Sequence, residues 1–163
     1  MGLILVSTNN LDFKIKRLEA LLEKGDFNGA VAVSGDLEEK GLEDSKALTL
    51  MAEVKVIEGD YDRAGALARK AIDNNSLNIV ARYVLACSLR KKRKLLEAAD
   101  IYKQIINWKP DDPVAHLYLA DALSDAGQNE EALSAYLRAA RLDKQGDVGK
   151  LARESILRLR GVK

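Results

Sequence analysis

A chain of 163 residues, of which 47% are hydrophobic and 31% charged, has the composition of one helical domain rather than of a disordered chain. Lysine and arginine (26) nearly balance aspartate and glutamate (25), so the net charge of +1 does not point to nucleic acid. One cysteine excludes an internal disulfide, and no apolar run reaches the roughly 18–20 residues of a membrane span. We therefore expect a helical protein of the cytoplasm, with no nucleic acid as partner and no direct insertion into a membrane.

The charge is distributed unevenly along the sequence. Residues 1–78 hold 10 lysines and arginines against 14 aspartates and glutamates, a net charge of −4. The remaining residues hold 16 against 11, a net charge of +5. This polarity is compatible with end-to-end contacts between copies, with an acidic partner at the C-terminal half, or with a random surface distribution.

The first ten residues are predicted to be an extended N-terminal segment. Asn9 or Asn10 is the expected N-cap of the helix that follows. The apolar stretch 3–6 either packs against that helix or marks the junction with a preceding domain, and the sequence does not decide between the two.

From residue 11 to residue 142, apolar residues recur three and four positions apart, which is the spacing of amphipathic helices. Asp60 and Asp112 are expected N-caps, Pro113 suits a first helical position, and Gly127 and Gly41 are expected stops. The predicted helices are 11–24, 27–40, 44–58, 61–74, 78–92, 95–108, two more within 110–142, and an end helix over 147–160.

The helices repeat with a period of 34 residues. Alanine recurs at this period four times, at Ala30, Ala64, Ala98 and Ala132. The turn between paired helices recurs in step, with glycine in three copies and Arg93 in the other. Because a close helix crossing leaves no room for a larger side chain, Ala98→Leu is expected to lower the melting temperature far more than Ala99→Leu.

A helix–turn–helix period of 34 is typical of tetratricopeptide repeats, and this chain resembles that family. The third and fourth copies carry most of the pattern, with Arg82 and His116 in place of the first aromatic residue, while the first two copies are degenerate. The resemblance implies an all-α, right-handed solenoid of about four helix pairs with a C-terminal capping helix. The implied segments are an extension (1–10), four repeats (11–44, 45–78, 79–112, 113–146), and the capping helix with its tail (147–163).

Nothing in the sequence supports catalysis. A nucleophilic triad would have to use His116, which the repeat register places at a packed helix contact. The chain has no histidine and cysteine cluster for zinc and no glycine-rich phosphate motif. We expect no enzyme activity, no cofactor and no metal site.

The run of five cations at 90–94 has three interpretations. It is a nuclear localisation signal, a contact for an acidic partner, or a solvated helix end where cations favour the C-terminal dipole.

The family resemblance implies a concave groove, lined by the first helix of each pair, that receives a partner peptide or helix. Chaperone-binding members grip an acidic tail with cations, whereas the matching positions here carry no cation and include Glu19 or Glu53, so that ligand is disfavoured. The predicted function is a non-catalytic protein-binding module; the alternative is a self-associating, homo-oligomeric scaffold or spacer in a secretion or envelope-assembly complex. Whether the end helix covers the groove is left open. The repeat register places these residues in the groove: Lys46, Thr49, Glu53, Val80, Tyr83, Val84, Cys87, Arg90, Lys91, Val114, Leu117, Tyr118, Asp121 and Asp125.

Overall fold

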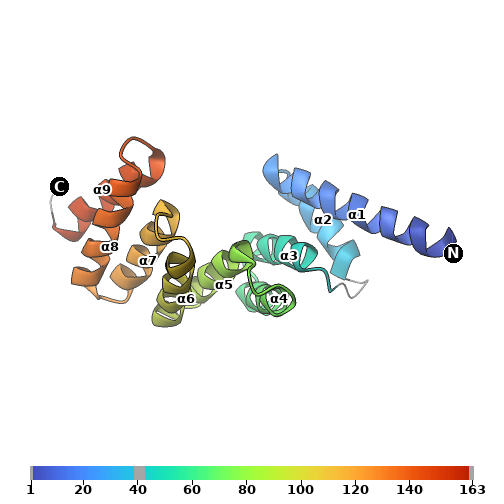
Figure 1. Cartoon of the computed structure of the whole chain (residues 1–163), viewed down its shortest axis with the longest axis horizontal. Coiled ribbons are helices and arrows are strands. Elements are labelled where there is room, and N and C mark those ends of the chain that lie inside the picture. Colours follow the sequence, from blue (N-terminus) through green and yellow to red (C-terminus); the bar gives the residue numbers. More distant parts are fainter. Residues whose placement is uncertain (1, 39–42, 162–163) are drawn as a thin grey trace. The chain divides into compact units, whose positions relative to one another are not determined.

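The computed structural model describes the backbone of residues 2–38 and 43–161 and, within these ranges, the side chains from residue 10 onwards (Figure 1). All regular structure within these ranges is α-helical, so the predicted all-α class is confirmed. The described helices are α1 (Gly2–Glu23), α2 (Phe27–Glu38), α3 (Ser45–Glu58), α4 (Tyr61–Asn74), α5 (Ile79–Lys91), α6 (Leu95–Trp108), α7 (Pro113–Asp125), α8 (Asn129–Leu142) and α9 (Asp147–Leu159).

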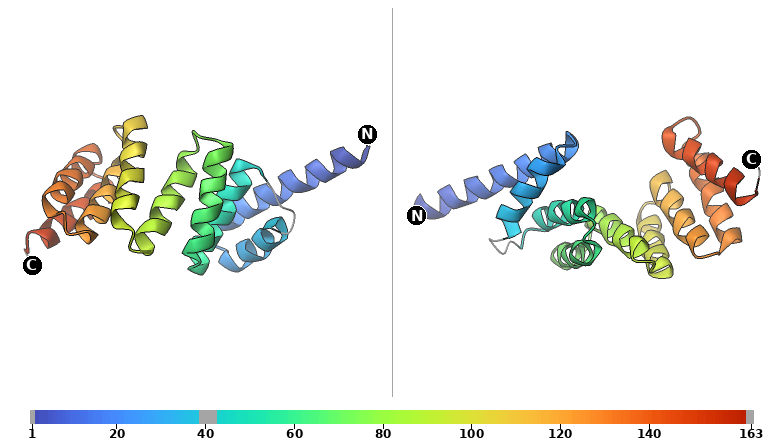
Figure 2. Two further views of the ribbon diagram at one scale, coloured as in Figure 1. Left: turned by 90° about the horizontal axis from the view of Figure 1, so that it is seen from below. Right: turned by 180° about the vertical axis from the view of Figure 1, so that it is seen from behind.

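The chain forms two compact units, Met1–Val84 and Leu85–Lys163, and the boundary falls inside α5. In the first unit α1 packs against α2 and α3, and α3 packs against α4. In the second unit α7 packs against α6, α8 and α9 (Figures 1 and 2). Within the first unit, the paired helices α1/α2 and α3/α4 and the successive first helices α1 and α3 are neighbours, and within the second unit the pair α7/α8 is, as repeats stacked inside each unit require. Because α9 packs against both α7 and α8, it takes the place that the first helix of another pair would occupy.

The four alanines at the 34-residue period lie in equivalent positions. Ala30, Ala64, Ala98 and Ala132 stand near the starts of α2, α4, α6 and α8, and all four are fully buried. A side chain larger than alanine would separate the crossing helices at these points. Ala99 is also buried, at 1% exposure, so it is not the tolerant neighbour that the sequence led us to expect.

Helix starts also recur with the repeat. Asp44, Asn78 and Asp112 cap α3, α5 and α7, each accepting a hydrogen bond from the backbone N–H three residues later, at 2.7, 2.9 and 3.3 Å. Such caps satisfy donors that have no partner inside the helix. The predicted caps Asp60, which accepts from the backbone N–H of Arg63 at 3.1 Å, and Asp112 are confirmed.

The turn before each second helix needs a left-handed backbone. Gly25, Gly59 and Gly127 have φ values of 71°, 80° and 79°. Arg93, which replaces glycine in the third copy, has a φ of 61° and is strained there because it carries a Cβ. The repeated turn thus imposes a left-handed backbone on Arg93, although arginine disfavours this conformation.

The prediction for the first ten residues is wrong. The backbone is helical from Gly2, so α1 begins nine residues earlier than expected and neither Asn9 nor Asn10 is its cap. No proline interrupts this stretch, and a helix that is already nucleated extends over such residues. The predicted stop at Gly41 lies outside the described residues.

Candidate functional site

The first unit contains a groove between α1, α3 and the start of α5, with a volume of about 680 Å³. We call it the acidic groove. Its apolar wall includes Leu22 and Leu50 together with two strongly exposed side chains, Leu77 at 73% and Val80 at 52% exposure. Exposed apolar side chains that line a concave surface are typical of a contact site for another molecule.

Carboxylates outnumber cations in the acidic groove. Glu19, Glu23, Asp44 and Glu53 line it, against the single cation Lys46. The ammonium of Lys46 lies 2.7 Å from a carboxylate oxygen of Glu19, which neutralises one of these charges. The acidic groove therefore keeps an excess of negative charge.

Glu53 is the carboxylate most affected by its surroundings. It is half-buried on α3, and no described residue donates a hydrogen bond to it or forms an ion pair with it. Burial, and secondarily the charge of Glu19, raise the pKa of Glu53. The described residues therefore give the charged form of Glu53 little stabilisation.

The wall that carries Val80 is fixed by a polar cluster. The side-chain amide of Asn78 donates to the hydroxyls of Ser45 and Thr49, both at 2.9 Å. The Thr49 hydroxyl donates in turn to the backbone carbonyl of Ser45 at 2.7 Å. Thr49 thus serves to hold the start of α5 on α3, and its buried side chain offers little surface to a partner.

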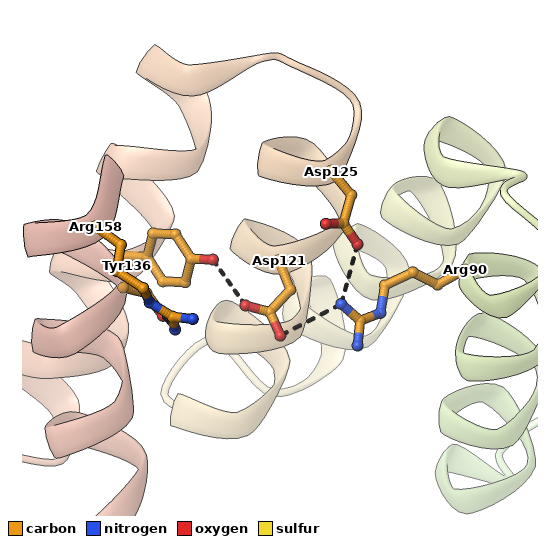
Figure 3. A network of polar contacts seen from close by, with 6 residues as sticks. Arg90, Asp121, Asp125, Tyr136 and Arg158 are labelled. Carbon is orange, nitrogen blue, oxygen red and sulfur yellow. Dashed lines mark hydrogen bonds and ion pairs between the residues drawn. The ribbon is translucent and has the colours of Figure 1, made fainter. Parts of the chain in front are cut away.

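The second unit contains a smaller cavity of about 370 Å³, which we call the polar pocket. Figure 3 shows its network. A guanidinium nitrogen of Arg90 lies 3.2 Å from Asp125 and 3.6 Å from Asp121, and the Tyr136 hydroxyl donates to Asp121 at 2.7 Å. Burial, followed by this bond to Asp121, raises the pKa of Tyr136 to about 12. Because these charges pair with one another, the network links α5, α7 and α8 rather than presenting free charge.

An aromatic pair connects α6 and α7 in the same unit. Tyr102 is buried on α6 and Tyr118 is exposed on α7, with ring centroids 5.8 Å apart and planes inclined by 47°. This tilted arrangement is favourable for aromatic rings. Tyr118 therefore has one side occupied by the fold and leaves the rest of its ring accessible.

The structure places the predicted binding residues in separate surroundings. Lys46, Thr49, Glu53 and Val80 line the acidic groove. Arg90, Asp121 and Asp125 line the polar pocket. The others line neither cavity: Val84 and Leu117 are buried, Tyr83, Cys87 and Val114 are half-buried, and Lys91 and Tyr118 are exposed.

Sequence reasoning missed several residues of both cavities. Leu77 stands in the loop between α4 and α5, which joins one helix pair to the next, so an inspection of first helices alone passes over it. Tyr136 belongs to a second helix, and Arg158, which donates to the hydroxyl of Ser155 at 2.8 Å, belongs to α9. The signal available in the sequence was an apolar residue, Leu77, directly before the capping asparagine Asn78, at a loop position with no place in the helix periodicity.

The two polar residues at the first aromatic position make the same bond. A guanidinium nitrogen of Arg82 donates to the carbonyl of Ser76 at 2.8 Å, and Nε2 of His116 lies 2.9 Å from the carbonyl of Pro110. A carbonyl only accepts, so this histidine nitrogen carries the proton. Both residues fasten a first helix to the loop before it, which gives His116 a structural role.

Two features are absent from the part of the chain that the structure describes. No three histidine, cysteine, aspartate or glutamate residues among them are grouped so that they could hold a metal ion. None of the helices in the described ranges combines the length and the apolar character needed to cross a membrane.

A family model described as tetratricopeptide repeat matches residues 89–153. A sequence search of curated proteins finds no match. The prediction of tetratricopeptide repeats is thus confirmed, most directly for the second unit.

Solved structures of similar fold include MamA (41 to the end) from Desulfovibrio magneticus RS-1, which is 19% identical, has a TM-score of 0.72, and covers 93% of each chain. The first tetratricopeptide repeat domain of Spaghetti (RPAP3), bound to the HSP90 peptide SRMEEVD, is 18% identical with a TM-score of 0.67, covering 72% of this chain and 91% of that one. The OM64 domain from Arabidopsis is 18% identical with a TM-score of 0.66, covering 73% and 96%. At these identities the similarity establishes an all-α repeat solenoid and no more.

Proposed function

This chain is a tetratricopeptide-repeat protein, and we propose that it is a non-catalytic interaction module that holds an apolar segment of a partner protein in the acidic groove. The observation that carries the proposal is the exposure of Leu77 and Val80 on the wall of a groove of about 680 Å³. Covering such side chains removes apolar surface from water, at roughly 25 cal/mol per Å².

The fixed geometry of the wall supports the proposal. Asn78 holds the start of α5 through the hydroxyls of Ser45 and Thr49, so Val80 does not have to be ordered when a partner binds. Preorganisation of this kind lowers the entropic cost of association. The RPAP3 domain, which has the same fold, is bound to a peptide in its solved structure.

Binding selections with the intact chain test this proposal. Peptides of 15 random residues are selected on the wild-type protein, and their affinities are then measured for the variant Leu77→Ser/Val80→Ser. Both side chains are exposed, so the fold should be unaffected, and binding should weaken at least about tenfold because the apolar contacts are lost.

The matched control is Ile57→Ser/Ala66→Ser, which removes exposed apolar groups of the same unit outside the acidic groove. Selected peptides should bind this variant like the wild type. Equal affinities for the groove variant and the wild type would show that the acidic groove is not the binding site.

Self-association is a second candidate, favoured by the opposite net charges of the two parts of the sequence, −4 for residues 1–78 and +5 for the rest. Contacts between oppositely charged ends weaken as salt screens them. Light scattering at low and high salt distinguishes the candidates, because only self-association gives a mass that rises with protein concentration and falls with salt.

A further inference from the structure

The acidic groove keeps charges that the described residues do not neutralise. Lys46 pairs with Glu19, and Asp44 is engaged in capping α3. Glu23 and Glu53 have no cationic partner among the described residues. A segment bound in the acidic groove would thus contact apolar side chains on one wall and carboxylates on the other.

Glu53 has the most to gain from a ligand. Its carboxylate is partly removed from water, and the nearby charge of Glu19 opposes its ionisation. A cation that entered the acidic groove would offset the cost of both effects, since an ion pair is stronger where water is excluded. A second carboxylate there would instead increase the repulsion.

We propose that the segment held in the acidic groove is a basic amphipathic peptide, whose apolar side chains cover Leu77 and Val80 and whose lysine or arginine pairs with Glu53. This inference rests on the proposed function and specifies the chemistry of its partner. Acidic segments such as SRMEEVD, the peptide held by the RPAP3 domain, are excluded by the same charges.

Three synthetic helical peptides of 14 residues provide the probe. They share the same leucine positions and carry lysine, glutamine or glutamate at all others. Their dissociation constants for the full chain are measured by fluorescence anisotropy at low and high salt. The leucine–lysine peptide should bind at least about tenfold more tightly than the leucine–glutamine peptide, and salt should reduce this difference. The leucine–glutamate peptide should bind most weakly.

Glu53→Gln separates the cation contact from the apolar contact. This variant should bring the affinity for the leucine–lysine peptide to within about threefold of that for the leucine–glutamine peptide, and it should leave the latter unchanged. Its melting temperature should equal or exceed that of the wild type, which shows that the fold is intact. The matched control Glu130→Gln, an exposed position of α8, should change neither affinity.

The outcomes separate this inference from the proposed function. If all three peptides bind equally and Leu77→Ser/Val80→Ser weakens each of them, the acidic groove binds apolar segments but the basic partner is wrong. Failure of the leucine–lysine peptide to bind, or an affinity unaffected by Glu53→Gln, also overturns the inference. A dimer that forms with rising concentration and is lost in Glu53→Gln would identify a second copy as the occupant, and would overturn it too.

Discussion

The acidic groove of the first unit and the polar pocket of the second differ in what their charged groups contact. In the polar pocket, Arg90 is paired with Asp121 and Asp125, and Tyr136 completes the network. In the acidic groove, Glu53 has no such partner among the described residues. Charges that satisfy one another stabilise the fold, whereas a partly buried charge without a partner is a functional-site candidate.

The two units also differ in how closely their sequences follow the repeat pattern, and the candidate binding groove lies in the less regular one. The second unit contains the residues that the family model matches, 89–153, and its cavity is the one with paired charges. The first unit has the degenerate repeats and the more apolar groove. In this chain the candidate binding surface therefore lies where the sequence departs from the repeat consensus. A consensus retains mainly the positions that stack neighbouring helices.

The largest loss of stability should come from placing a larger side chain where two paired helices pack closely, which we call the helix seam. This loss should be similar in the two units. Ala64→Leu and Ala132→Leu each place a large side chain at a fully buried position, and each should reduce the free energy of unfolding by about 2–3 kcal/mol in chemical denaturation. Ala66→Leu, on the exposed face of α4, is the control and should change it by less than about 0.5 kcal/mol. A penalty confined to one unit would show that the seams are not equivalent.

Removing the hydroxyl of Tyr136 should destabilise the second unit by about 1–2 kcal/mol, because Asp121 then loses a donor at 2.7 Å. The pKa of Tyr136 is raised to about 12 in the folded protein, against about 10 for an unfolded chain. The unfolded state therefore ionises first, and the stability due to this group is complete below pH 10 and is lost as the pH rises towards 12.

Denaturation of the wild type and of Tyr136→Phe over this pH interval measures the loss directly. The stability difference between the two proteins should shrink from pH 9 to pH 12. A difference that stays constant would mean that this phenol is not held in its neutral form by the fold.

Relief of backbone strain should give the smallest effect. Arg93→Gly should raise the free energy of unfolding by about 1 kcal/mol, since glycine adopts a φ of 61° without a Cβ clash and its extra freedom in the unfolded chain offsets only part of the gain. Lys92→Gly removes a neighbouring cation where φ is not positive and should bring no gain. Equal changes in the two variants would point to charge rather than to strain.

Most of the fold could be predicted from the sequence because its signals are local and repeated. Asp60 and Asp112 cap helices where expected, and the alanines such as Ala98 mark the seams. The start of α1 was missed because the asparagines that resemble its cap lie inside the helix. Capping preference indicates that a helix is able to begin at a residue, not that it must.

The candidate site was predictable only in part. The repeat register assigns Glu53 and Val80 to one surface because both lie on first helices, and in the structure both line the acidic groove. It does not reveal that Leu117 is buried, nor that Arg90 is already paired with Asp121. Burial and pairing depend on how neighbouring side chains fill space, which periodicity does not contain.

The most direct test is an NMR titration of the intact chain with the leucine–lysine peptide, in which the amide chemical shift of each residue is followed. Saturable changes should concentrate at the acidic groove, around Glu53 and Val80, and should be absent around Arg90 and Asp121. Changes centred on the polar pocket, or spread evenly over both units, would contradict the assignment of partner binding to the acidic groove.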